Sequence, residues 1–511
     1  MSLRSIILNT SLVTVLSAAA KVLGFVREQA MASALGAGAL TDAYVVALTI
    51  PTVSYAFLST ILLNAFIPVY SGCRARGEHE RAARLAQTVA GCTLIASLLI
   101  ALAGIALAPV LVRVLAPGFP SEVADLTTAL TRLLFVGTGI ATLGALGGAA
   151  LNSHGIFSLP AAAPAVQNTL AIAGVVFLTR RLSVWGIAYG TVAGAALGLA
   201  VQLGALKRTP LCSVGRVDLG DSAAVQVLRM SVPLVLGAIL AQSQTIVEKV
   251  LASGLPQGSL SALNYATKLA LLPIATVVAA VSTVVFPRLG EQYGRKDCEG
   301  LARTVAGATL AVSAIVIPVA FAFAALSVPT IRVAYQRGAF GEESVITAAR
   351  SLMFYAGWVV FSGISSLFAK VCYAMQDSLT PLVASALNAV ITVAAAYVLV
   401  RPMAAAGLAL AASLGALAGA ALLLHFLLRR LEPDVVASML SSHAKVLTSA
   451  AIMALGCVAA LRQWPIADGS LSSAARFILI AGGGAAFYVA CLAALGVLPL
   501  SAISRMVRQR T

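Results

Sequence analysis

A series of apolar stretches, each about 20 residues long or longer, follows the chain from one end to the other. Stretches of this length can cross a bilayer as helices, and they lack the strict apolar–polar alternation that is typical of barrel strands. The pattern therefore predicts an all-α polytopic membrane protein with fourteen transmembrane helices. The predicted spans are 5–32, 37–70, 85–108, 125–151, 160–180, 184–206, 225–252, 258–288, 302–326, 347–371, 380–400, 405–428, 443–462 and 473–498.

The composition agrees with this prediction. Of the 511 residues, 60% are hydrophobic and 10% are charged, whereas soluble domains average about 25% charged residues. The segment Met1–Ala20 is similar to a cleavable signal peptide, but Asn9, Thr10, Ser11 and Thr14 interrupt its apolar stretch. This interruption favours an uncleaved first span.

The positive charge is concentrated between alternate spans. The net charge is +16, and basic residues cluster at Arg74, Arg76, Arg81 and Arg84; Lys207, Arg208 and Arg216; Arg288, Arg295 and Lys296; Arg429, Arg430 and Lys445; and Arg505, Arg508 and Arg510. The positive-inside rule places these clusters, and both termini, in the cytoplasm. Arg180, Arg181, Arg332 and Arg337 would then lie outside, against the rule. Because no aromatic residues interleave with the clusters, we expect no nucleic-acid partner.

The chain matches itself at an offset of about 220 residues, which indicates an internal repeat. The matched pairs include Ser33 with Ser253, Glu28 with Glu248, Tyr44 with Tyr265, Pro51 with Pro273, and Gly118 with Gly338. We expect an N-lobe in residues 1–220 (spans 1–6), a C-lobe in residues 221–440 (spans 7–12), and two extra helices in residues 441–511 that flank a lipid-accessible groove. Six spans per repeat give both lobes the same orientation, which is the parallel-repeat plan of transporters.

The first spans of both lobes carry ionisable residues. In the N-lobe these are Lys21, Arg27, Glu28 and Asp42, and in the C-lobe they are Glu248, Lys249 and Lys268. Each costs about 2.5–3.5 kcal/mol or more at bilayer depth, so such residues usually face a bundle interior or a wet cavity. We expect them to line a central cavity that accepts an anionic headgroup. The alternatives are side chains that reach the interface and internal ion pairs that hold helices together.

The types of these residues favour a phosphate ligand. Arginine donates two parallel hydrogen bonds from a planar fork, and lysine supplies a compact point charge. On an unbroken helix Lys21 and Arg27 would lie about 120° apart, so we expect the helix to break at Gly24 if both are to reach one cavity.

The sequence gives no support for an enzyme. There is no nucleotide-binding G-x-x-x-x-G-K-[ST] motif and no nucleophile elbow. The seven cysteines include no C-x-x-C pair, and the four histidines include no H-E-x-x-H, so we expect no metal and no cofactor.

The sequence resembles the MurJ/MviN family, the lipid II flippases of the multidrug/oligosaccharidyl-lipid/polysaccharide exporter superfamily. The resemblance lies in KVLGFVREQAMASALGAGALTDAYVVALTIP (21–51), AFIPVY (65–70), APGF (116–119), LNSHGIFSLPAAAPAVQN (151–168), LASGLPQGSLSALNYATKLALLP (251–273), VFPRL (285–289), YQRGAF (335–340), YAMQDSLTP (373–381) and GLALAASLGALAGA (407–420). It implies passage of undecaprenyl-pyrophosphate-linked muropeptide from the inner to the outer leaflet of the bacterial cytoplasmic membrane, for peptidoglycan synthesis and cell shape.

The family's substrate-binding positions correspond to Lys21, Arg27, Asp42 and Lys268. The chain departs from the family pattern at Lys21, where arginine is usual, in Thr52–Leu63, which has no charge, and at Thr267-Lys268, where Asp-Arg is common. The expected partners are a lipid-linked glycan pyrophosphate and membrane lipid, with a coupling cation and cell-wall synthesis proteins as further candidates.

Three alternatives to a lipid II flippase stay open on the sequence. A flippase for exopolysaccharide or O-antigen units would use the same carrier lipid. A non-transporting scaffold for cell-wall synthesis would need none of the cavity charges. A drug/cation antiporter of the same superfamily ranks below these, because its cavity would be rich in acidic residues.

Overall fold

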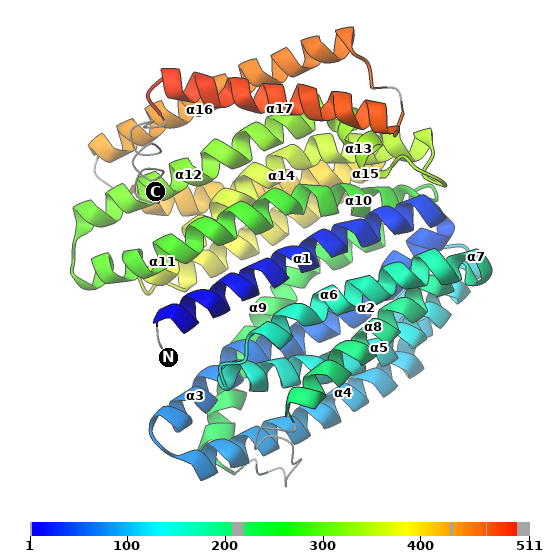
Figure 1. Ribbon diagram of the computed structural model, residues 1–511, viewed down its shortest axis with the longest axis vertical. Coiled ribbons are helices and arrows are strands. Elements are labelled where there is room, and N and C mark those ends of the chain that lie inside the picture. The colour runs from blue at the N-terminus through cyan, green and yellow to red at the C-terminus, as the bar shows by residue number, and fades with distance from the viewer. Residues whose placement is uncertain (1–2, 207–217, 219, 430–432, 467, 498–511) are drawn as a thin grey trace. The chain divides into compact units, whose positions relative to one another are not determined.

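All regular structure in the described part of the chain is helical (Figure 1); the computed structural model describes residues 3–206, 218, 220–429, 433–466 and 468–497. Within these residues, 12 helices are long and apolar enough to cross a membrane. One of them, the 50-residue α15 (Leu379–Leu428), contains two predicted spans, separated by a break at Ala404, where φ is 51°. With α1 (Leu3–Leu35), they match the fourteen predicted spans one for one, so the all-α polytopic fold is confirmed.

The helices form two compact units. Unit 1 comprises the described residues up to Ser261 together with Gly338–Phe340, and unit 2 comprises the remaining described residues. Unit 1 contains α1, α2 (Ala39–Ile61), a π-helical turn η1 (Leu62–Phe66), α3 (Ile67–Ala75), α4 (His79–Leu115), α5 (Ser121–Ser153), α6 (Ser158–Ala173), a π-helical turn η2 (Gly174–Leu178), α7 (Thr179–Leu182), α8 (Trp185–Leu206) and α9 (Ser222–Ala252).

Unit 2 contains most of α10 (Ser259–Pro273), whose first three residues belong to unit 1. It continues with a π-helical turn η4 (Ile274–Val278), α11 (Ala279–Gly294), α12 (Cys298–Ala325), α13 (Ser327–Tyr335), α14 (Glu342–Ala374), α15, α16 (Pro433–Gln463) and α17 (Leu471–Ala494). The helices α14 and α15 pack closely along each other, and α12 packs against both α14 and α16.

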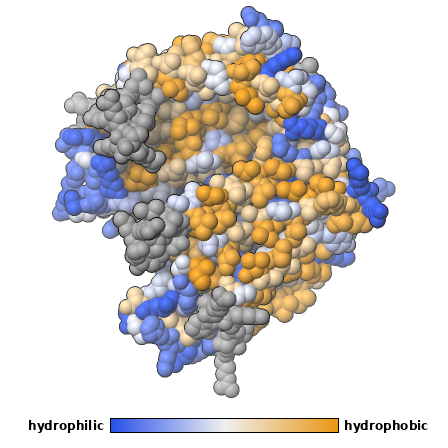
Figure 2. Space-filling view, viewed as in Figure 1, coloured by the Kyte–Doolittle hydropathy of each residue, from blue (hydrophilic) through white to orange (hydrophobic). Residues whose placement is uncertain are grey.

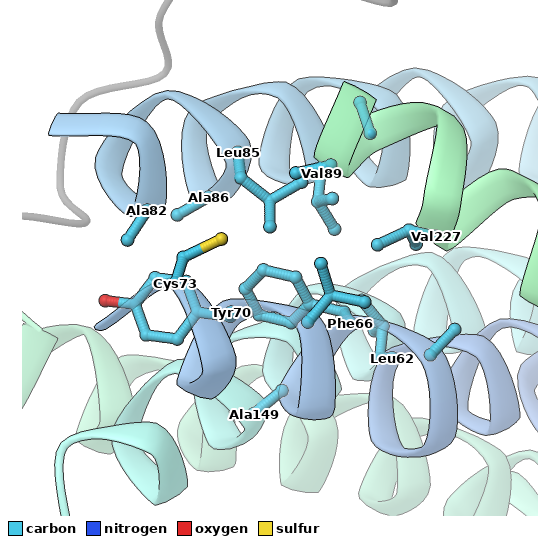
Figure 3. Packing of buried hydrophobic residues seen from close by; sticks show 14 residues of the cluster. Leu62, Phe66, Tyr70, Cys73, Ala82, Leu85, Ala86, Val89, Ala149 and Val227 are labelled. Carbon is cyan, nitrogen blue, oxygen red and sulfur yellow. The ribbon is translucent and has the colours of Figure 1, made fainter. Parts of the chain in front are cut away.

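Helix α9 packs with unit 1, although the repeat makes it the first helix of the C-lobe. It contacts α2 and α4, and Figure 3 shows its Val227 against the apolar side chains of η1, α3 and α4. Phe66 is at the centre of this cluster with no exposed surface, and its ring centroid lies 5.3 Å from that of Tyr70. The two units are defined by contacts between residues, whereas the two lobes are defined by the sequence repeat. The units therefore do not test the lobe boundary at 220/221, which stays a prediction.

Small residues between Gly190 and Gly198 let α6 and α8 approach closely. A Cβ atom at Gly194 would lie 2.8 Å from the backbone of Gln167, and one at Gly190 would lie 2.6 Å from the Leu170 carbonyl oxygen. Close backbone approach at small residues is a common way to pack membrane helices. The contact at Gly194 fixes the position of Gln167 and therefore of its neighbour Asn168.

Large apolar side chains remain exposed on the outside of the helices. Phe177, Val284 and Leu471 are exposed by 75%, 76% and 88%, respectively. Figure 2 shows hydrophobic residues along the helices and hydrophilic residues concentrated near helix ends. This distribution is expected for a multi-pass membrane protein whose outer side chains contact lipid.

Ion pairs surround Glu78 in the loop between α3 and α4, where one basic cluster is predicted to be cytoplasmic. Arg76 and Arg81 donate hydrogen bonds to its two carboxylate oxygens and hold the pKa of Glu78 below its ordinary value. Arg81 also contacts Asp221, at 3.4 Å, at the start of α9. Lys207, Arg208, Arg216, Arg430, Arg505, Arg508, Arg510 and Cys212 lie outside the described residues.

Truncating Phe66 tests this packing. Phe66→Ala leaves a cavity in a cluster to which α3, α4, α5 and α9 contribute, so we expect a loss of unfolding free energy of about 3 kcal/mol. This loss lies at the low end of the range for truncating a buried phenylalanine, because lipid chains solvate apolar groups in the unfolded chain. The measurement is the thermal unfolding of the purified protein in detergent.

Phe177→Ala is the matched control, since Phe177, like Phe66, lies in a π-helical turn but is 75% exposed. Its effect should stay within about 0.5 kcal/mol. Equal losses for the two variants would contradict the packing described for unit 1.

Candidate functional site

Arg27 is a cation on an apolar helix, and its side chain is partly exposed. Its Nη2 donates to Glu28 Oε1 at 2.7 Å, and its Nη1 donates to Asn168 Oδ1 at 3.1 Å. The Arg27 side chain is 21% exposed, while that of Glu28 is 6% exposed. The guanidinium is therefore held by two partners and neutralised by the buried Glu28, and part of the Arg27 side chain stays exposed.

Asn168 on α6 is a site residue that sequence reasoning missed. It accepts the hydrogen bond from Arg27 and donates one, of 3.1 Å, to the carbonyl oxygen of Ala20 on α1. Its amide lies against Gly24, where a Cβ atom would be 3.4 Å from Nδ2. The only signal in the sequence was that Asn168 ends a family-like stretch; nothing local connected it to a residue 141 positions away.

The expected break at Gly24 is wrong. Helix α1 runs without interruption from Leu3 to Leu35. Gly24 gives room to the Asn168 side chain, so its small size serves helix packing rather than a bend. On this continuous helix Lys21 lies about 9 Å along the axis from Arg27 and about 120° around it, and its side chain is exposed.

Tyr44 supplies the neighbouring polar group from α2. It is 3% exposed, and its hydroxyl lies 3.1 Å from Thr191 Oγ1 on α8. The phenol interacts electrostatically with both Arg27 and Glu28. Four helices of unit 1 thus contribute to one polar cluster, made of Arg27, Glu28, Tyr44, Asn168 and Thr191, which we call the Arg27 cluster.

Glu248 and Lys249 form a second ion pair between adjacent residues. Lys249 Nζ donates to Glu248 Oε1 at 2.8 Å on α9, although neighbouring positions on a helix point in different directions. Here the lysine side chain is 6% exposed and the glutamate side chain is 21% exposed, the reverse of the order in the Arg27–Glu28 pair. The two matched helices of the repeat therefore each bury one charge, on Glu28 or Lys249, and neutralise it with the preceding residue.

Asp42 is 3% exposed and binds backbone groups at the start of α10. Its Oδ2 accepts a hydrogen bond of 2.6 Å from Gly258 N, and its Oδ1 accepts one of 2.7 Å from Ser261 N. A carboxylate at a helix N-terminus satisfies N–H groups that have no partner within the helix. Asp42 thus acts as a distant cap for α10, and a role in substrate binding stays a prediction.

The ends of α1 and α9 meet loops of unit 1 through two equivalent contacts. Ser253 Oγ accepts a hydrogen bond of 3.2 Å from Gly118 N, and Ser33 O accepts one of 2.8 Å from Ala339 N. A Cβ atom at Gly118 or Gly338 would collide with the backbone at Ser253 or Ser33, respectively. We call residues 33–42, 116–119, 252–261 and 338–340 the loop cluster; its paired contacts follow the offset of about 220 residues.

Lys268 is exposed on α10, in unit 2. One turn earlier, the ring of Tyr265 packs on that of Tyr335, with centroids 4.9 Å apart. In unit 1 a pocket of about 390 Å³ lies between the end of α1 and η2, with Ser33, Thr179 and Arg180 among its lining residues. None of the predicted site residues lines this pocket, so the proposed binding chemistry rests on the Arg27 cluster.

These features define a class of protein: a multi-pass, all-helical membrane protein with an internal repeat and neutralised charges within its membrane helices, as in transporters. The family model described as "Lipid II flippase MurJ" matches residues 31–473, and the chain therefore belongs to the MurJ family. A relative from Burkholderia cenocepacia, "Lipid II flippase MurJ", is 29% identical over 439 residues and covers 84% of each chain.

Solved structures agree on the fold. The structure described as "Lipid II flippase MurJ, inward closed conformation" has a TM-score of 0.81 at 20% identity and covers 95% of this chain and 100% of that one. An inward-facing multidrug resistance MATE family transporter of the MOP superfamily has a TM-score of 0.65 at 19% identity, covering 80% of this chain and 94% of that one. The family model confirms the expected family, and these two structures share the fold of this chain.

Replacing Gly338 tests the loop cluster. Its φ of +57° and its contact with the backbone of Ser33 both exclude a side chain. We expect Gly338→Ala to lower the unfolding free energy by at least about 1–2 kcal/mol, the cost of the left-handed conformation alone. Thermal unfolding of the purified protein measures the loss.

Gly307→Ala is the control, because Gly307 lies within α12 and a Cβ atom there meets open space. That variant should be as stable as the wild type or more stable, by up to about 1 kcal/mol. A Gly338→Ala protein as stable as Gly307→Ala would show that the contact with Ser33 is not made.

Proposed function

We propose that the chain is a flippase that moves lipid II, a peptidoglycan precursor linked to undecaprenyl pyrophosphate, from the inner to the outer leaflet by alternating access. The family to which it belongs and the Burkholderia cenocepacia relative both carry the name lipid II flippase. The structural observation that supports the proposal best is the partly exposed Arg27 side chain, whose guanidinium is held on an apolar helix by Glu28 and Asn168.

The Arg27 cluster suits a pyrophosphate headgroup. Two of the guanidinium's five N–H donors are used by Glu28 and Asn168, which leaves donors for phosphate oxygens. Charge-assisted, bidentate hydrogen bonds between arginine and phosphate are among the strong ones in proteins. Lys21 and Lys268, both exposed, are the further cations that we include in the proposed binding site on the resemblance.

The loop cluster is our proposed gate for the alternating-access cycle. Its contacts include hydrogen bonds and close backbone approaches at Gly118 and Gly338, two exposed residues. Exposed contacts of this kind open at a low free-energy cost compared with a packed core. Asp42, which binds Gly258 and Ser261, would then set the closed geometry.

The proposed location is the bacterial cytoplasmic membrane, with both termini in the cytoplasm. The basic clusters between alternate spans support this orientation. A coupling cation and cell-wall synthesis proteins are proposed partners, and the membrane potential, worth about 2.3 kcal/mol per charge per 100 mV, could supply the work of transport.

A flippase for another glycan on the same carrier lipid is the second candidate function. The uncharged segment Thr52–Leu63 and the lysine at position 21 favour it, since both reduce the arginine content expected of the family site. A scaffold without transport activity is the third candidate, and it differs from both flippases in needing no cation at position 27.

Substitution of Arg27 separates these functions. In a strain whose growth depends on this chain, we expect Arg27→Ala to abolish growth and to leave lipid II in the inner leaflet, because the diphosphate loses its bidentate partner. Lys21→Ala and Lys268→Ala should each reduce the flipping rate by about tenfold or more, which corresponds to one charge-assisted contact of about 1.5–3 kcal/mol. A leaflet-resolved assay of lipid II accessibility measures the effect.

Arg113→Ala is the control, since Arg113 is an exposed arginine at the end of α4. It should support normal growth. Normal growth of a folded Arg27→Ala protein would favour the scaffold, and depletion that leaves the cell wall intact but removes a surface glycan would favour the second flippase.

A further inference from the structure

The Glu28 carboxylate has one neutralising partner and is otherwise buried. The residue is 4% exposed, and its Oε1 accepts the hydrogen bond from Arg27 Nη2. Its Oε2 is buried, and no group in the described part of the chain donates a hydrogen bond to it. An ionised carboxylate in such surroundings is stabilised by its ion pair with Arg27 and by little else.

In the part of the chain that the structure describes, the two elements that pack along α1 offer Glu28 no second cation. Helix α6 packs along α1 and has no ionisable residue, and the adjacent η2 has none either. The facing titratable group from α2 is the phenol of Tyr44, which is paired with Thr191. On α1 itself Lys21 is exposed and lies about 120° around the helix from Arg27.

The side-chain exposures of Arg27 and Glu28 indicate which of the two can bind a ligand. Arg27, with 21% of its side chain exposed, is accessible to an anion, whereas Glu28, with 6%, is not. A diphosphate carries more charge than a carboxylate, so, besides the donors that Glu28 and Asn168 leave, it competes for the Nη2 hydrogen that Arg27 now donates to Glu28. Glu28 would then be a buried carboxylate without a counter-ion, and burial of an isolated charge favours its neutral form.

We infer that Glu28 is a proton-binding site that is linked to the ligand: when an anionic headgroup takes over Arg27, the Glu28 carboxylate binds one proton from water. The balance is simple. The Arg27–Glu28 ion pair and a diphosphate become an Arg27–diphosphate ion pair and a neutral Glu28 carboxyl group, with one proton removed from solution. Release of the headgroup returns the proton and restores the original pair.

The Glu248–Lys249 pair is the internal comparison. It has the same adjacent arrangement on α9, but its buried member is the lysine, and its glutamate is 21% exposed. If Lys249 were withdrawn from the pair, Glu248 would still be partly solvated. Loss of the counter-ion would therefore not require Glu248 to bind a proton. The two pairs therefore predict different proton linkage at matched positions of the repeat.

This inference rests on the proposed function, because it needs a phosphate-bearing lipid at Arg27. The test is titration calorimetry of the purified full-length protein with farnesyl diphosphate, a short-chain prenyl diphosphate, in two buffers that differ in ionisation enthalpy. We expect the wild type to take up about one proton more per bound ligand than Glu28→Gln does, because the ligand's own ionisation is common to both. Because binding takes up a proton, the wild-type affinity should fall as the pH rises, by up to about tenfold per pH unit, relative to the variant.

Glu248→Gln should keep the wild-type proton uptake. Infrared difference spectra of the wild type, ligand-bound minus free, give a second readout that needs no variant: a new band from a protonated carboxyl group should appear. Ligand binding with equal proton uptake in wild type and Glu28→Gln, or without the new band, would overturn the inference and leave the proposed function standing. Failure of the wild type to bind the diphosphate would overturn both.

Discussion

The ion pair between Arg27 and Glu28 is the interaction on which the proposed activity depends. A guanidinium among apolar helices is stable only if its charge is neutralised, and removal of one partner from a buried pair costs about 3–5 kcal/mol. The chain solves this with the next residue in the sequence, at 2.7 Å, and uses Asn168 to hold the fork in place. The acid is buried and the side chain of the base is partly exposed, so in the proposed activity Arg27 is the member of the pair that meets an anion. Glu248 and Lys249 repeat the arrangement in reverse.

The sequence was sufficient to predict the spans, because each is a long apolar stretch between charged or turn-forming residues, and even the two helices within α15 were separated at the correct place. It was not sufficient to predict what the charged residues contact. Asp42 binds backbone groups 216 and 219 positions away, and Asn168 reaches Arg27 across 141 positions, so neither partnership leaves a local pattern. The prediction about Gly24 failed for the same reason: a glycine that makes room for a distant side chain looks, in one sequence, like a glycine that bends its own helix.

The repeat explains why several small residues matched at an offset of about 220 positions before any contact was known. Ser33 and Ser253, and likewise Gly118 and Gly338, occupy equivalent places in the loop cluster, where each glycine packs on the backbone at the serine of the other repeat. Because the two contacts are packed in the same way, each repeat needs a small residue at both of these positions. The Arg27 cluster is less symmetric, since Thr191 corresponds to an alanine in the second repeat, and this asymmetry is expected if only one lobe supplies the main phosphate contact.

The most direct test of the account is the geometry between Arg27 and the headgroup. Solid-state NMR of arginine-labelled protein in bilayers with an undecaprenyl-pyrophosphate-linked muropeptide would detect dipolar coupling between phosphorus and guanidinium nitrogen nuclei. The account predicts a coupling that corresponds to a direct hydrogen bond and that disappears in Arg27→Lys. A lipid that binds with no phosphorus contact to Arg27, and with unchanged spectra in Arg27→Lys, would contradict it.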